Sequence, residues 1–259
     1  MVESFGGGGF GGGNGFGNNG NNNNGRGDKW SNLGALFKMG DISEKTRQHL
    51  VRVYSTLMTS TGACAGGMVL NSGFLFGGGV VGILSFVLMC YLMYQVHNRN
   101  NSEDHRILFL VGLAFFMGLT AGPAIHMTAT LSPEILIQAI IYTFVAFGSF
   151  SGIALFSQRR SMLFLGGIIS TMMSTLFVYS LMGMVFGANP LGGAYVFISL
   201  FMTCLWIIFD TQKIVEQSEA GNRDVPTHSL ELFIDLFELF IKLLRMLEKM
   251  NENQNKKKK

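Results

Sequence analysis

Seven apolar segments follow one another along the chain from residue 50 onward, with short polar stretches between them. Each is close to the roughly 20 residues that an α-helix needs to cross about 30 Å of hydrocarbon. The pattern therefore predicts an all-α membrane protein with seven transmembrane helices. The predicted spans are approximately 50–70, 74–96, 107–127, 135–157, 161–187, 190–212 and 229–247.

The composition also indicates a membrane protein. Charged residues make up 14% of the chain, against about 25% in soluble proteins, and the mean hydropathy is +0.35. The net charge of +3 comes largely from Lys256–Lys259 at the C-terminus and does not indicate nucleic-acid binding. We therefore expect membrane lipid as a partner and no nucleic acid.

The chain divides into four parts. Residues 1–28 form a Gly/Asn-rich tract with too few aliphatic side chains to bury a core, which predicts disorder. A charged pre-membrane segment (29–49), the seven-helix domain (50–248) and a basic tail (249–259) follow.

Two sequences are typical of helix starts. Asp41-Ile42-Ser43-Glu44 can cap a helix. Ser132-Pro133-Glu134 combines a capping serine, a proline at the first helical position and an acid at the positive end of the helix dipole.

Glycines four residues apart occur in several predicted spans. Such a spacing leaves a groove on one helix face, where a neighbouring backbone can approach closely. We interpret these pairs as packing sites within one bundle. They are Gly62/Gly66, Gly118/Gly122, Gly148/Gly152 and Gly183/Gly187.

The charges between the spans predict the orientation. Connections near 97–106, 158–160 and 213–228 carry Lys or Arg, and those near 71–73, 128–134 and 188–189 carry none. The N-terminal flank is also basic. By the positive-inside rule, the N-terminus and the charged connections are cytosolic.

The seventh segment carries a stripe of charged residues on one face of the predicted helix. A full crossing would place the basic tail on the far side of the membrane, against the charge bias, whereas a re-entrant helix would keep both termini cytosolic. An amphipathic helix lying on the membrane surface is a further alternative. Burial would put Leu239 on the outer side. The stripe consists of Glu231, Asp235, Glu238, Lys242, Arg245 and Lys249.

Asp210 and Asp235 stand out because each lies in an otherwise apolar predicted span. A carboxylate inside the membrane is unfavourable unless it faces a cavity or a partner, so both are candidate functional residues. Two neighbouring carboxylates cannot both ionise readily, and such a pair would share a proton near neutral pH. Without that proton it would offer hard oxygen ligands to Ca²⁺. Alternatively, each aspartate pairs with a local cation, such as Lys213 beside Asp210.

Four sequences resemble the Bax inhibitor-1 family of transmembrane Bax inhibitor motif proteins. They are FDTQ at 209–212, FIDLFELFIKLLR at 233–245, QRRSMLFLGG at 158–167 and GLTAGPA at 118–124. The resemblance implies a seven-helix bundle with the last helix central. It also implies an endoplasmic reticulum membrane location, a pH-sensitive calcium leak, suppression of cell death and cell-death regulators of the Bcl family as partners.

The family's paired aspartates carry over to Asp210 and Asp235, which are expected to form the pH sensor and ion pathway and to bind Ca²⁺ transiently. In bacterial relatives an arginine latches to the pair, and Arg99 and Arg106 are loose candidates for it. Glu231 and Glu238 are accessory candidates. Calcium and protons are then the species handled, with Ca²⁺ as permeant ion and no cofactor.

Other functions are compatible with the same residues. A proton-coupled cation exchanger would use the aspartate pair as a carrier site, and a non-conducting protein would act through membrane partners alone. An intramembrane aspartyl protease shows Tyr-Asp and Gly-x-Gly-Asp, whereas this chain has Phe209-Asp210 and Ile234-Asp235. We therefore expect no catalytic site and no enzyme activity.

Lys256 and Lys257 occupy the fourth and third positions from the end of the chain. This spacing is that of a dilysine retrieval signal for the endoplasmic reticulum, which works only from a cytosolic tail. A solvated, lipid-attracted lysine tail is the alternative.

Overall fold

The computed structural model divides into two units, Met1–Lys38 and Met39–Lys259. It describes residues 42–71, 79–156, 165–186 and 194–258, all within the second unit. The predicted disordered tract (1–28), most of the pre-membrane segment and most of QRRSMLFLGG lie outside the described residues.

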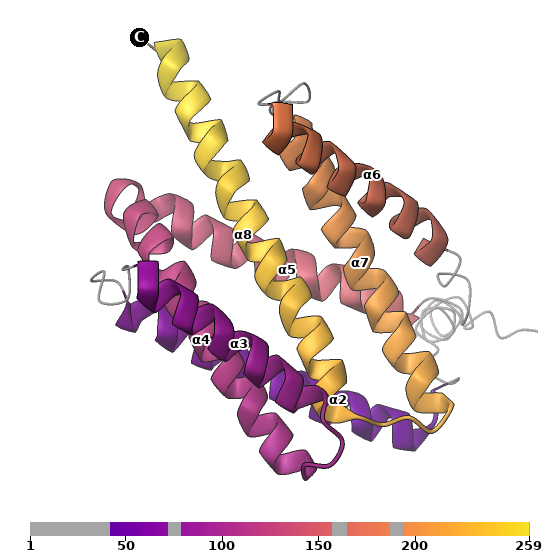
Figure 1. The fold of residues 1–259 in the computed structure, drawn as a ribbon. Coiled ribbons are helices and arrows are strands. Elements are labelled where there is room, and N and C mark those ends of the chain that lie inside the picture. The colour runs from indigo at the N-terminus through magenta and orange to yellow at the C-terminus, as the bar shows by residue number, and fades with distance from the viewer. Residues whose placement is uncertain (1–41, 72–78, 157–164, 187–193, 259) are drawn as a thin grey trace, which may run out of the picture. The chain divides into compact units, whose positions relative to one another are not determined.

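The described residues form seven helices and no strand, which confirms the all-α prediction (Figure 1). Four of these helices are long and apolar enough to cross a membrane: α4, α5, Gly166–Val185 of α6 and Tyr195–Glu219 of α7. The chain is therefore a multi-pass membrane protein. The helices are α2 (Glu44–Leu70), α3 (Gly79–His97), α4 (Glu103–Leu131), α5 (Pro133–Phe156), α6 (Leu165–Phe186), α7 (Ala194–Glu219) and α8 (Val225–Lys258).

Several helices extend beyond the predicted spans because charged turns continue them past the apolar part. The Ser43 hydroxyl caps α2 by accepting from the Thr46 backbone N–H at 3.3 Å, and α5 begins at Pro133. Both predicted helix starts are thus confirmed. The largest difference is in α8, which includes nearly all of the predicted basic tail.

Helix α8 is central. It packs against α2, α3, α4, α5 and α7, and Leu232, Phe233 and Leu239 on it are at most 1% exposed. The surface-helix alternative is therefore wrong for α8, and so is the placement of Leu239 on the outer side. Leu239 is enclosed because neighbouring helices cover the apolar face of α8 as well as its polar stripe.

Contacts between helix termini define two ends of the bundle. At the first end, the start of α2 meets the end of α7 and the start of α8, through Ser43 N–H to Glu219 and His49 to His228. At the second end, the Thr128 hydroxyl of α4 donates to Glu248 of α8. Figure 1 shows α8 running from its turn with α7 to the labelled C-terminus. Helix α8 therefore traverses the whole length of α4.

This course brings two sequence predictions into conflict. The basic residues Arg99 and Arg106 lie at the first end, where both approach Asp224, whereas Lys256 lies beyond Glu248 at the second. If the first end is cytosolic, as the positive-inside rule predicts, the tail is on the far side of the membrane. A dilysine signal would then be out of reach of cytosolic coat proteins.

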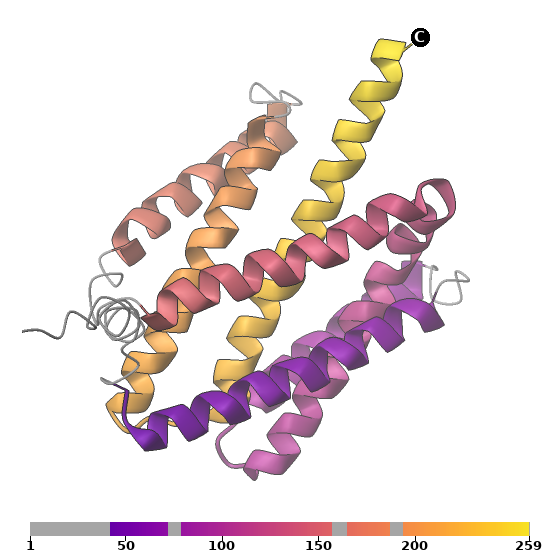
Figure 2. The same ribbon diagram turned by 180° about the vertical axis from the view of Figure 1, so that it is seen from behind.

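One of the four predicted glycine pairs forms the closest helix contact. A Cβ on Gly118 would lie 2.0 Å from the Cys64 carbonyl oxygen, and one on Gly122 would lie 3.0 Å from that of Met68. On α2 the matching residue is Gly67, where a Cβ would lie 2.2 Å from the Phe115 carbonyl oxygen. The glycines hold α2 against α4 at backbone distance (Figure 2).

The packing prediction is wrong for two other pairs. Gly62, Gly66, Gly148 and Gly152 have nothing within 4 Å of an added Cβ, so these positions face away from neighbouring helices. Gly187 lies outside the described residues.

We expect Gly118→Ala to destabilise the protein, because the new methyl group would meet the Cys64 backbone and force α2 away from α4. Overpacking of this kind costs about 1–3 kcal/mol. Gly66→Ala is the matched control, since its methyl group enters open space and alanine favours a helix by roughly 0.5–1 kcal/mol over glycine. Thermal unfolding in detergent should show a lower midpoint for Gly118→Ala alone; equal midpoints would contradict the packing.

We also expect single cysteines at Ser102 and Asn255 to react from opposite sides of the membrane. Both positions are exposed and lie at the first and second end, respectively. The measurement is labelling of sealed vesicles with a membrane-impermeant maleimide, in a background where the native cysteines are replaced by alanine. Labelling of both positions from one side would show that α8 does not cross.

Candidate functional site

Asp210 and Asp235 lie on the two neighbouring helices α7 and α8, and both are buried, at 9% and 6% exposure. The Asp235 side chain is surrounded by negative charge from Asp210, Glu238 and Glu231, and by positive charge from Lys213. Within the described residues its Oδ2 atom has no hydrogen-bond partner. The fold therefore brings together the two carboxyls that the sequence singled out.

A lysine ammonium lies beside one of them. Lys213 Nζ is 3.9 Å from Asp210 Oδ1 and donates to Glu231 Oε1 at 2.8 Å. Among the described residues, no hydrogen bond joins the Asp210 and Asp235 carboxyls. The structure thus shows the local cation pairing that the sequence left open as an alternative, with Glu231 as the stronger partner of Lys213.

Farther along α8, its polar stripe again contacts α7. Lys242 Nζ lies 2.5 Å from Glu238 and donates to Thr203 Oγ1 on α7 at 2.7 Å. We call the set of Asp210, Glu231, Asp235, Glu238, Lys213 and Lys242 the carboxyl cluster. It contains two more acids than lysines. In the described part of the chain, the buried Glu231 Oε2 atom has no hydrogen-bond partner, like Asp235 Oδ2. Such a site needs a proton or a cation to balance its charge.

The FDTQ sequence fixes α7 against α5 and α6. The Phe209 ring fills the space beside Gly166 of α6, where a Cβ would lie 2.7 Å from the ring. The Thr211 hydroxyl lies 3.2 Å from that of Ser151 on α5, and Gln212 donates to the Ala154 carbonyl at 3.1 Å. Asp210 is thereby directed toward α8 by its neighbours on both sides.

The two candidate latch arginines lie elsewhere. Arg106 is 7% exposed and donates to Asp224 Oδ2 at 2.9 Å, to Thr227 and to the Val96 carbonyl. Arg99 is exposed and lies 3.9 Å from the same carboxyl. Burial opposes ionisation of Asp224, but the hydrogen bond and charge of Arg106 hold its pKa below the usual range. Both arginines therefore fix the start of α8, and Asp224, which the sequence analysis did not single out, is their partner.

A buried histidine pair was also missed. His49 Nε2 and His228 Nδ1 are 2.8 Å apart, and His228 Nε2 lies 2.8 Å from Gln217 Oε1. Because a carbonyl oxygen only accepts, His228 carries its proton on Nε2, and His49 Nε2 donates to His228 Nδ1. Both histidines lie in polar sequence at the edge of an apolar segment, so no local pattern marks them, and their sequence separation of 179 residues hid the contact.

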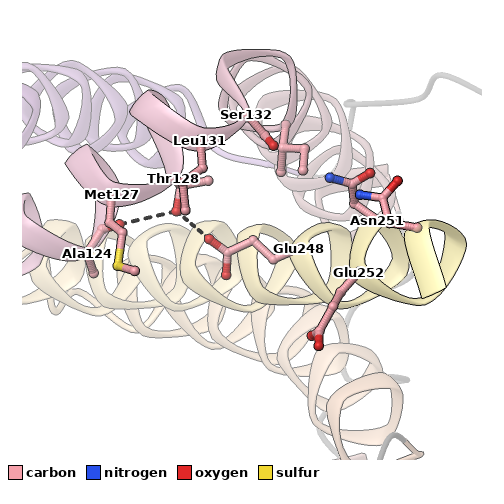
Figure 3. A pocket seen from close by; sticks show the side chains of 10 residues that line it. Ala124, Met127, Thr128, Leu131, Ser132, Glu248, Asn251 and Glu252 are labelled. Carbon is pink, nitrogen blue, oxygen red and sulfur yellow. Dashed lines mark hydrogen bonds between the residues drawn. The ribbon is translucent and has the colours of Figure 1, made fainter. Parts of the chain in front are cut away.

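The second end of the bundle contains a cavity of about 480 Å³ that both polar and apolar side chains line. Figure 3 shows Thr128 of α4 donating to Glu248 of α8, with Asn251 and Glu252 farther along α8. Glu252 is exposed and pairs with Lys256 at 2.6 Å. The hydrogen bond between Thr128 and Glu248 holds the far part of α8 against α4. The cavity lies outside the carboxyl cluster.

The described part of the chain contains no group of three or more His, Cys, Asp or Glu side chains that could hold a metal ion.

Comparison with known proteins gives a consistent result. The model of the family described as inhibitor of apoptosis-promoting Bax1 matches residues 46–253. A probable Bax inhibitor 1 from Paralichthys olivaceus is 35% identical over 233 residues, covering 90% of this chain and 98% of the relative. Bax inhibitor 1 from Bos taurus and that from Homo sapiens are 37% and 36% identical, with the same coverage.

We expect the histidine pair to make stability fall on acidification. Burial, followed by the charges of His228, Arg223 and Arg52, lowers the pKa of His49 to about 4, against a smaller opposing effect of Asp224. Burial also lowers the pKa of His228, with Asp224 raising it and Lys213 lowering it. The unfolded chain then binds more protons than the folded one between pH 6.5 and 4, so stability is complete above this window and is lost as pH falls through it.

The measurement is the thermal midpoint at pH 7 and pH 5. His49→Gln keeps a donor for His228 but does not titrate. Its loss of unfolding free energy between pH 7 and pH 5 should therefore be smaller than that of the wild type, by on the order of 1 kcal/mol, and its thermal midpoint should fall less. His126→Gln, at an exposed position, is the control. Equal pH dependence in all three proteins would rule out the pair as the cause.

Proposed function

Because the chain belongs to the Bax inhibitor-1 family of cell-death-regulating membrane proteins, we propose that it is a pH-sensitive calcium leak channel of the endoplasmic reticulum membrane. The observation that carries this proposal is the excess of acids over lysines in the carboxyl cluster between α7 and α8, in which Asp210 and Asp235 are buried. Charge balance there requires a mobile positive species, either H⁺ or a metal cation.

The chemistry of the cluster suits calcium. Ca²⁺ prefers oxygen ligands and tolerates irregular geometry, and Asp235 and Glu231 each present a buried carboxyl oxygen that lacks a hydrogen-bond donor. A proton at either residue would remove part of the negative charge that attracts Ca²⁺. Proton occupancy and cation occupancy therefore oppose each other, and this competition is the proposed origin of pH sensitivity.

Lys213 has a defined role in this scheme. Its ammonium partly balances Asp210 and Glu231 in the structure, as a tethered cation in the path of a mobile one. Passage of Ca²⁺ then requires that the Lys213 ammonium move away from these carboxyls.

The same competition also fits a proton-coupled cation exchanger. Because Asp235 and Glu231 offer the same buried oxygens to a proton and to a cation, one site can bind the two species alternately. An exchanger would drive calcium uptake against its gradient when an opposing proton gradient is imposed on vesicles, whereas a leak would only dissipate the calcium gradient.

The cellular setting belongs to the proposal as well. We propose residence in the endoplasmic reticulum, a cytosolic N-terminus and Bcl-family cell-death regulators as partners, on the ground of family membership and of the basic first end. Lys256 and Lys257 can act in retrieval only if the cysteine labelling described above places Asn255 on the cytosolic side.

We expect Asp210→Asn and Asp235→Asn each to flatten the pH dependence of calcium flux, and the double substitution to abolish it, because each removes one titrating carboxyl from the cluster. The measurement is calcium flux from liposomes containing purified protein and a calcium dye, between pH 6 and pH 8. Glu252→Gln, which removes an exposed acid from the same helix, should keep the wild-type profile. A double variant with the wild-type profile would leave the two aspartates with a structural role only, and absence of flux from every protein would favour a non-conducting partner.

A further inference from the structure

A cavity of about 270 Å³ lies between α2 and α5, against α8. We call it the α2–α5 pocket. In Figure 2, α2 and α5 each cross α8, and side chains of all three helices line the pocket. Phe233, Leu236, Phe237 and Phe240 of α8 line it, and the first two are 1% and 6% exposed. The pocket thus has a deep apolar floor on the central helix.

The mouth of the pocket opens away from the bundle. Ile140 and Phe144 of α5 and Val69 of α2 line the pocket and are 41%, 46% and 74% exposed. Helix α5 is one of the candidate membrane spans, and Ile140 and Phe144 lie in its interior rather than at its ends. The mouth therefore faces the hydrocarbon of the bilayer.

The walls offer no free hydrogen-bonding group to a ligand. The two hydroxyls in the lining already donate within their own helices, Thr61 to the Leu57 carbonyl at 2.8 Å and Thr143 to the Ala139 carbonyl at 2.6 Å. Cys64 is a free, buried thiol, which behaves as a small apolar group. Water and polar ligands gain nothing in such a cavity, so the occupant must be a hydrocarbon.

The size of the pocket narrows the choice of occupant. An α-helix with side chains is about 10–12 Å across, too thick to enter a cavity of about 270 Å³. A single flexible hydrocarbon chain fits, and phospholipid tails surround the mouth at this depth.

We propose that the α2–α5 pocket binds one acyl chain of a membrane phospholipid, which inserts between α2 and α5 and contacts Phe233 and Phe237 on α8. At 3.6 residues per turn these residues lie on the face of α8 opposite to Asp235 and Glu238. The acyl chain therefore supports the apolar side of the helix whose polar side carries the carboxyl cluster. This assignment is independent of calcium transport.

The test uses a phospholipid with a photoactivatable diazirine in its acyl chain. Purified protein is reconstituted in phosphatidylcholine vesicles containing this lipid, irradiated and mapped by mass spectrometry. We expect labelling of the buried floor residues Phe233 and Leu236, which ordinary contact with the bilayer cannot reach. Labelling confined to surface positions such as Met58 or Phe177 would overturn the proposal.

Two variants fill the pocket from opposite walls. Ala65→Trp and Ile140→Trp should each reduce labelling of the floor several-fold, whereas Met58→Trp, at an exposed position of α2 outside the pocket, should leave it unchanged. Thermal midpoints near that of the wild type establish that each variant is folded. Undiminished floor labelling in both folded variants would overturn the proposal.

The chemical class of the occupant is tested by competition. Excess unlabelled phospholipid should reduce floor labelling in proportion to its mole fraction. A sterol that abolishes floor labelling at a low mole fraction, where added phospholipid has little effect, would show that the pocket selects a sterol and would overturn the acyl-chain assignment.

Discussion

A helix with a charged stripe can cross a hydrocarbon layer only when other helices surround it, and the architecture of this protein follows from that constraint. Helix α8 carries the stripe, and five other helices pack against it. Helices α2 and α4 approach each other closely at Gly118 and Gly67, and both pack against α8. Small residues far from the carboxyls thus contribute to keeping them out of lipid.

The helices around α8 make different contacts with its two faces. Helix α7 meets the polar face and supplies Lys213 and Thr203 to it. Around the α2–α5 pocket, α2 and α5 meet the apolar face with carbon atoms, the Cys64 thiol and hydroxyls that donate within their own helices. A shift of α8 would therefore change the environment of the carboxyls and the shape of the lipid-facing pocket together. The charge state of the carboxyl cluster and an acyl chain in the α2–α5 pocket would therefore act on the same helix.

Polar contacts hold α8 at both of its ends. At the first end, Asp224 binds Arg106 and His228 binds His49; at the second, Glu248 accepts from Thr128. Between them, Asp235 has a buried oxygen without a hydrogen-bond partner among the described residues. The helix is thus held at both ends by paired polar groups, and the proposed cation site lies between them.

The sequence by itself determined the helices, the helix starts at Ser43 and Pro133, and the presence of acids within apolar segments, because these features depend on neighbours a few residues apart. Only the tertiary structure decided that Gly118 packs while Gly66 faces outward, and that Asp224 is the partner of Arg106. Contacts between helices depend on the rotation and register of each helix, which the packing of all of them sets together. A local sequence pattern therefore does not determine the rotation and register of a helix.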